Sequence, residues 1–161
     1  MPIFLPLPQG ICGRNPSVML ATVFGIGRFR WAPGTAGSLV TLPLAFILSG
    51  PFPLLAGALI AFVLGMIAIP AMEKAEHDSG MVVIDEVSGQ LIAMAAMRPG
   101  NLPDLALAFI LFRLFDVTKP WPACYFDRKV PGAFGVMMDD VVAGIMGALV
   151  LLGIHTAGIM P

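Results

Sequence analysis

The sequence predicts an all-α fold, a compact helical bundle with membrane-embedded helices. Three observations support this prediction. Hydrophobic residues make up 58% of the 161 residues and charged residues only 12%, about half the charged share of an ordinary soluble domain. Two long stretches, residues 31–72 and 141–161, contain no Lys, Arg, Asp or Glu. The apolar runs are rich in Ala, Leu and Met and show no sustained two-residue alternation, which favours helix over strand.

A single domain is expected over residues 1–161. Residues 1–24 are expected to form an irregular N-terminal arm, because four of the first ten residues are Pro or Gly. This arm does not look like a signal peptide, since no basic residue precedes its apolar residues. The motif-bearing core is expected over residues 25–144, followed by a C-terminal membrane helix over residues 141–160.

Two stretches are long and apolar enough to cross a bilayer, which takes about 20 residues. They are residues 52–72 and residues 141–160. Residues 38–48 are shorter and contain Pro43, so they fit either a short or kinked span or a helix buried in protein.

The middle of the chain is expected to fold into an antiparallel helical hairpin. Residues 82–97 form the first helix, residues 98–101 the turn, and residues 104–115 the return helix. Such a hairpin places the start of its first helix beside the end of its second. Together with the start of the last helix, it is expected to bring five acids to one level: Asp85, Glu86, Asp116, Asp139 and Asp140.

The basic residues predict how the chain lies in a membrane. Arg28 and Arg30 precede residues 38–48, Lys74 follows residues 52–72, and Arg128 and Lys129 precede residues 141–160. Under the positive-inside rule these ends lie in the cytoplasm. We therefore expect a multi-pass protein whose acidic site faces the cytoplasm.

The glycine-rich segment over residues 25–38 is a candidate phosphate loop. Its glycines free backbone N–H groups, and a helix that begins there would present its N-terminus to an anion. The segment is not a Walker loop, because the Gly-Lys-Ser/Thr ending is missing. The alternative is a turn that enters a membrane helix, with its arginines touching lipid headgroups. The candidate substrate contacts are Gly34, Thr35, Ser38, Arg28 and Arg30.

Three further segments place charged side chains in apolar surroundings. Asp85 and Glu86 are adjacent within an apolar run, where carboxylates are usually paired or bound to a metal. Arg113 and Asp116 share a helix face, and Lys119 follows them. The last segment carries Asp139 and Asp140. A salt bridge within the bundle and helix capping are the competing interpretations.

These residue types predict a metal-assisted phosphate site. Hard oxygen ligands without His or Cys suit Mg²⁺, and cations beside the metal suit a phosphate ester. The site is therefore expected to act on a phosphorylated, lipidic substrate at a membrane. The net charge of −1 gives no indication of nucleic-acid binding.

Taken in order, these segments resemble the phosphatidylglycerophosphatase A family. The matching stretches are residues 32–38, residues 83–86 with Gly89, residues 112–116 with residues 119–122, and residues 135–140 with residues 143–144. The resemblance implies an α-helical bundle in the inner membrane of a bacterium. It also implies Mg²⁺-dependent removal of the terminal phosphate from phosphatidylglycerophosphate.

The mechanism we expect divides the roles among these residues. Asp85, Glu86, Asp139 and Asp140 bind Mg²⁺, with Asp85 also counted among the catalytic residues. Asp116 either completes the metal shell, orients a water or forms a phosphoryl-enzyme. Arg113 and Lys119 neutralise the charge that develops on the phosphoryl group.

A different class of function is a small non-enzymatic membrane subunit whose acids bind a cation. A cation pathway requires charges within the long spans, and residues 52–72 and 141–160 contain none. The oligomeric state, including a homo-oligomer, stays open.

Overall fold

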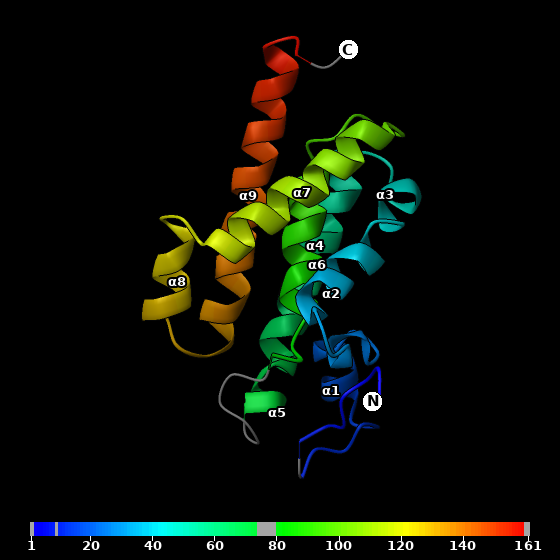
Figure 1. The fold of residues 1–161 in the computed structure, drawn as a ribbon, viewed down its shortest axis with the longest axis vertical. Helices are drawn as coiled ribbons and strands as arrows, with labels where there is room; N and C mark the ends of the chain where they lie inside the picture. The colour runs from blue at the N-terminus through cyan, green and yellow to red at the C-terminus, as the bar shows by residue number, and fades with distance from the viewer. Residues whose placement is uncertain (1, 9, 74–79, 160–161) are drawn as a thin grey trace.

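The computed structural model describes residues 2–8, 10–73 and 80–159, and their fold is all-helical, as predicted (Figure 1). No strand occurs in these ranges; an isolated bridge joins Phe4 and Phe29. The elements in chain order are α1 (Pro16–Ala21), the 3₁₀ helix η1 (Ile26–Arg28), α2 (Pro33–Thr41), α3 (Leu44–Ile47), α4 (Pro51–Ala68), α5 (Pro70–Glu73), α6 (Ile84–Met94), α7 (Leu102–Thr118), α8 (Ala123–Lys129) and α9 (Gly132–Thr156).

Proline and asparagine mark several helix ends. Pro43 separates α2 from α3, and Pro51 opens α4, where its missing N–H costs nothing because the first turn has no intrahelical acceptor. The Asn15 side chain accepts a hydrogen bond from the Ser17 N–H at 3.0 Å and so caps α1. This short helix lies within residues 1–24, the arm that was expected to be irregular, so part of that arm is helical.

The last helix begins at Gly132, nine residues before the start expected from the sequence. The expected start at residue 141 was set by the absence of charge, and Asp139 and Asp140 therefore lie inside α9 rather than ahead of it. Both carboxylates are buried, and the helix begins directly after its N-cap residue, Pro131.

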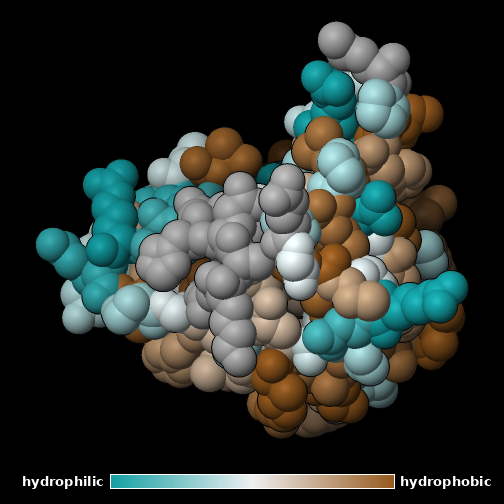
Figure 2. All heavy atoms as spheres, turned by 90° about the horizontal axis from the view of Figure 1, so that it is seen from below, coloured by the Kyte–Doolittle hydropathy of each residue, from teal (hydrophilic) through white to brown (hydrophobic). Residues whose placement is uncertain are grey.

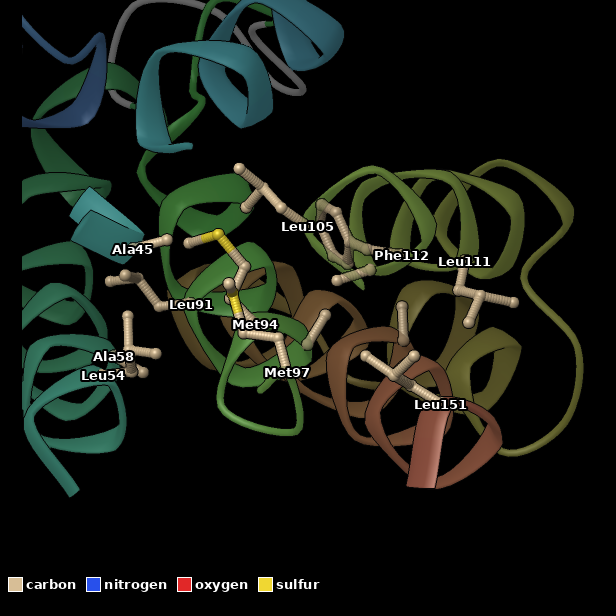
Figure 3. Packing of buried hydrophobic residues seen from close by; sticks show 13 residues of the cluster. Ala45, Leu54, Ala58, Leu91, Met94, Met97, Leu105, Leu111, Phe112 and Leu151 are labelled. Carbon is tan, nitrogen blue, oxygen red and sulfur yellow. The ribbon is translucent and has the colours of Figure 1, made fainter. Parts of the chain in front are cut away.

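Helix α6 forms the centre of the bundle and packs against α4, α7 and α9. Leu91 of α6 faces Leu54 and Ala58 of α4 across one interface (Figure 3). Phe112 of α7 and Leu151 of α9 are also fully buried in this core. Burial of such side chains supplies about 1.5–3 kcal/mol each relative to exposure.

Two glycines let α6 and α9 approach closely. A Cβ at Gly144 would lie 2.3 Å from the Gly89 carbonyl oxygen, and a Cβ at Gly89 would lie 2.5 Å from the Asp140 carbonyl oxygen. One turn before these glycines are Glu86 on α6 and Asp140 on α9. The crossing therefore sets the acids of the two helices side by side.

Two helical segments are long and apolar enough to cross a membrane, Pro51–Met72 and Gly132–Thr156. Only 33% and 39% of their most apolar windows are buried in the protein. On α4, Phe52 is 85% exposed and Ile67 is 66% exposed. Exposed apolar surface of this extent is typical of membrane contact. Seen from below, hydrophilic residues gather on the α8 side, at the left of the view, and again on the opposite side (Figure 2). Lys74, used above for orientation, lies outside the described residues.

A polar cluster joins three elements far from the expected site. The fully buried Asp104 of α7 accepts hydrogen bonds from the backbone N–H and the Nε of Arg98, both at 2.9 Å. Its other oxygen lies 3.0 Å from the Arg98 Nη2 and 3.1 Å from the His155 Nε2 of α9. The Arg98 guanidinium holds the pKa of Asp104 well below its usual range. The ionised carboxylate therefore ties the α6–α7 turn to the end of α9.

We expect Asp104→Asn to destabilise the fold by about 2 kcal/mol, below the usual cost of breaking a buried pair because Arg98 is partly solvated. A carboxyl group with a lowered pKa stabilises the fold above its unfolded pKa, about 4, and less as the pH falls further. Thermal unfolding should therefore separate the variant from the wild type at pH 7, and the gap should narrow below pH 4. Equal melting temperatures of the variant and the wild type at pH 7 would show that the Asp104 carboxylate does not stabilise the fold.

Candidate active site

Six carboxylates line one cavity of about 650 Å³. Five of them come from three helices, α6, α7 and α9, and the sixth is Asp127 of α8. The rest of the wall is formed by Gly34 at the start of α2, by Lys119 and by apolar residues. The five acids from α6, α7 and α9 are Asp85, Glu86, Asp116, Asp139 and Asp140. The antiparallel arrangement of α6 and α7 thus brings together the acids that the sequence analysis placed at one level.

Glu86 is the centre of a hydrogen-bond network. Its Oε2 accepts a hydrogen bond from the Ser38 hydroxyl at 2.9 Å and another from the Arg113 guanidinium. Arg113 also pairs with Asp116 at 2.9 Å. A Cβ at Gly34 would lie 1.9 Å from the Glu86 Oε1, so a side chain at this position would collide with the carboxylate. Glycine at position 34 therefore leaves space for Glu86 beside the start of α2.

The Lys119 side chain connects α8 with α9. Its Nζ donates a hydrogen bond to the Asp127 Oδ1 of α8 at 2.8 Å and another to the Asp139 Oδ2 of α9. Burial alone would lower the pKa of Lys119, but these two carboxylates hold it above its usual range. The ammonium is therefore charged whenever the site is intact.

The acids provide a donor set that fits a divalent cation. Glu86, Asp116 and Asp140 each offer an oxygen, and these oxygens lie within 4.8 Å of one another. The Asp140 Oδ2 is buried and has no hydrogen-bond partner among the described residues, a costly state unless a ligand satisfies it. Burial, followed by the charge of Glu86, raises the pKa of Asp85 well above its usual range. The six acids of the cavity outnumber the two cations that pair with them, Arg113 and Lys119, and a metal ion would balance this excess of carboxyl groups.

The residues predicted to bind substrate are dispersed. Of these residues only Gly34 lines the cavity. The Ser38 side chain is fully buried and donates to Glu86, while the Arg28 Nε donates to the Leu5 carbonyl at 2.8 Å. Thr35 and Arg30 are not part of the cavity wall.

Asp127 belongs to the site although the sequence analysis did not select it. It lies in the charged run of residues 127–129, which resembles an ordinary solvated surface. Only the fold of α8 against α9 brings its carboxylate to Lys119. No motif spacing could have revealed this pair.

The fold and the cavity define a class: a helical bundle with apolar outer helices and a buried carboxylate cluster. Residues 19–155 match the model of the family described as phosphatidylglycerophosphatase A. The chain belongs to this family, as the sequence resemblance indicated, and it is a phosphatase.

Named relatives cover most of the chain. A phosphatidylglycerophosphatase A of Escherichia coli is 35% identical over 147 residues, covering 88% of this chain and 86% of the relative. One of Haemophilus influenzae is 39% identical over 146 residues, covering 88% and 90%. A Bacteroides thetaiotaomicron protein, 34% identical over 149 residues and covering 83% and 90%, carries a provisional name as a phosphatidylinositol-3-phosphatase. No solved structure gives a significant match.

Proposed function

We propose that this protein is a Mg²⁺-dependent lipid phosphatase that hydrolyses phosphatidylglycerophosphate to phosphatidylglycerol and phosphate. The observation that carries the proposal is the cavity of six acids in a member of this family, with a buried Asp140 oxygen that has no hydrogen-bond partner among the described residues. The names of the Escherichia coli and Haemophilus influenzae relatives support the lipid. Family membership favours this function over the non-enzymatic membrane subunit considered above.

Glu86, Asp116 and Asp140 would hold the Mg²⁺, with Asp85 and Asp139 beside them in the same cavity. When bound, the ion would supply Lewis-acid polarisation of the phosphoryl oxygens. Lys119, which lines the cavity, would donate a hydrogen bond to the phosphate. Arg113 is engaged by Glu86 and Asp116, and its proposed role is to keep these two carboxylates ionised and oriented.

Asp116 is better suited to hold the metal than to attack phosphorus. Its oxygen is paired with Arg113 at 2.9 Å, and an arginine partner reduces the nucleophilicity of a carboxylate by stabilising its charge. Direct attack by water is therefore the route that we propose. Asp85, whose pKa is raised by burial, is the candidate to accept a proton from that water.

We further propose that the protein is a multi-pass protein of a bacterial inner membrane, with its cavity facing the cytoplasm. The exposed apolar surface of α4 and α9 supports membrane insertion. Arg28 and Arg30 precede α2, whose Gly34 lines the cavity, and Arg128 and Lys129 end α8, whose Asp127 lines it, and this placement of basic residues supports a cytoplasmic cavity.

Metal removal tests the proposal directly. Purified protein in detergent should release phosphate from phosphatidylglycerophosphate with Mg²⁺, and EDTA should lower the rate about 100-fold or more, because Lewis-acid charge stabilisation would be lost. Addition of Mg²⁺ in excess should restore it. Phosphatidic acid and phosphatidylinositol 3-phosphate serve as comparison substrates. Equal rates with and without EDTA would exclude a metal requirement. Faster release from a comparison lipid would exclude phosphatidylglycerophosphate as the preferred substrate.

A further inference from the structure

We propose that Asp127 is a positioning residue of this site, which holds the Lys119 ammonium so that its remaining N–H is available to a phosphate group in the cavity. The inference rests on the proposed phosphatase function and adds a residue to it. Asp127 is contributed by α8, outside the three helices that carry the acid cluster.

The argument begins with the donors of Lys119. A lysine ammonium has three N–H donors on a flexible four-carbon stem. One of them reaches the Asp127 Oδ1 at 2.8 Å, and a second reaches the Asp139 Oδ2. Because the two carboxylates come from different helices, they fix the direction of the third N–H. Without Asp127, the ammonium could rotate about its stem and would pair with Asp139 alone.

The backbone around Lys119 restricts where its side chain can begin. Lys119 ends α7 in the left-handed region, with φ of 42°, and its N–H donates to the Phe115 carbonyl at 2.8 Å. A left-handed conformation is uncommon for a residue other than glycine. The stem therefore starts from a fixed point, and the two carboxylates determine where it ends.

The position of Asp127 is equally fixed. A Cβ at Gly135 would lie 3.2 Å from the carbonyl oxygen of Phe126 in α8, so α8 packs closely on the backbone of α9. Asp139 lies one turn beyond Gly135 on the same helix. This backbone contact sets the spacing of the two carboxylates that hold Lys119.

A purely structural role for the pair would have small consequences. The side chains of Lys119 and Asp127 are 29% and 37% exposed, and ion pairs with this much solvent contact contribute little to stability. If Asp127 acts through Lys119, its loss should instead weaken phosphate binding. The two roles therefore predict different kinetic constants.

The test uses Asp127→Ala and Asp127→Asn in the purified protein with Mg²⁺. For Asp127→Ala we expect KM for phosphatidylglycerophosphate and the Kd for inorganic phosphate each to rise about 10-fold, with kcat within about 2-fold, because a charge-assisted contact to bound phosphate is weakened. Asp127→Asn keeps an acceptor oxygen and should recover about half of this loss on a logarithmic scale. Arg128→Gln, on the exposed side of α8, is the matched control and should change neither constant.

A second comparison separates positioning from structure. In a Lys119→Met background, Asp127→Ala should have no further effect on KM or on phosphate binding, because the residue acts through Lys119. A lower kcat with unchanged KM, or effects that add in the double variant, would overturn the proposal. If the wild type hydrolysed no lipid phosphate, the proposed function would fail, and binding of inorganic phosphate would still report on Asp127.

Discussion

Asp140→Asn should lower phosphate release about 100-fold or more while leaving the melting temperature unchanged or higher. The asparagine keeps the size of the side chain but removes a charge from the proposed metal ligands Glu86, Asp116 and Asp140. In the metal-free protein this carboxylate shares one cavity with five other acids, so its neutralisation relieves repulsion. Loss of activity without loss of stability is the pattern of a functional residue under electrostatic strain.

Phosphate release at saturating Mg²⁺ and thermal unfolding with EDTA would measure the two effects. Asp104→Asn is the informative contrast, because it removes a buried carboxylate far from the cavity. That variant should lose stability and keep its activity at low temperature. If Asp140→Asn retained wild-type turnover, or if it unfolded as readily as Asp104→Asn, the assignment of Asp140 to the metal would be wrong.

Gly144→Ala should lower the melting temperature by about 5–10 °C and abolish most activity. The new Cβ would lie 2.3 Å from the Gly89 carbonyl oxygen, and two backbones cannot yield as a side chain can. Overpacking of this kind costs about 1–3 kcal/mol or more, equivalent to several degrees in a protein of this size. Separation of α6 from α9 would also move Asp140 away from Glu86.

Gly153→Ala is the matched control on the same helix. Nothing lies within 4 Å of a Cβ at Gly153, so the substitution gains helix propensity, up to about 1 kcal/mol, without a collision. We expect its melting temperature to stay the same or rise by up to about 3 °C, with full activity. Similar unfolding of the two variants would show that the Gly89–Gly144 contact does not limit the packing of α6 and α9.

Much of the site could be predicted from the sequence because its residues occur in local patterns. Asp85 and Glu86 are adjacent, Arg113 and Asp116 are three residues apart, and Asp139 and Asp140 open a long apolar run. A hairpin between the first two segments, together with the start of the last helix, is enough to bring these side chains to one level. The metal itself stays a prediction, since the structure supports it only through the geometry of its ligands.

Two residues that were expected at the bound phosphate have hydrogen-bond partners in segments distant from them in the sequence. Ser38 was expected at a bound phosphate, and it instead donates to Glu86, 48 residues away. Arg28 was expected to provide charge to the site, and its guanidinium donates a hydrogen bond to the Leu5 carbonyl oxygen. In both cases the residue type suits the predicted role, but the side chain forms a hydrogen bond with a residue of another segment.

Composition and helical spacing are local properties, and they were enough to predict the all-helical class, the apolar outer helices and the chemistry of the acids. The contact of Gly89 with Gly144, which sets the distance between Glu86 and Asp140, and the contact of Asp127 with Lys119 became visible only in the packed fold. These contacts depend on the close approach of whole helices, and backbone packing at single glycines controls that approach.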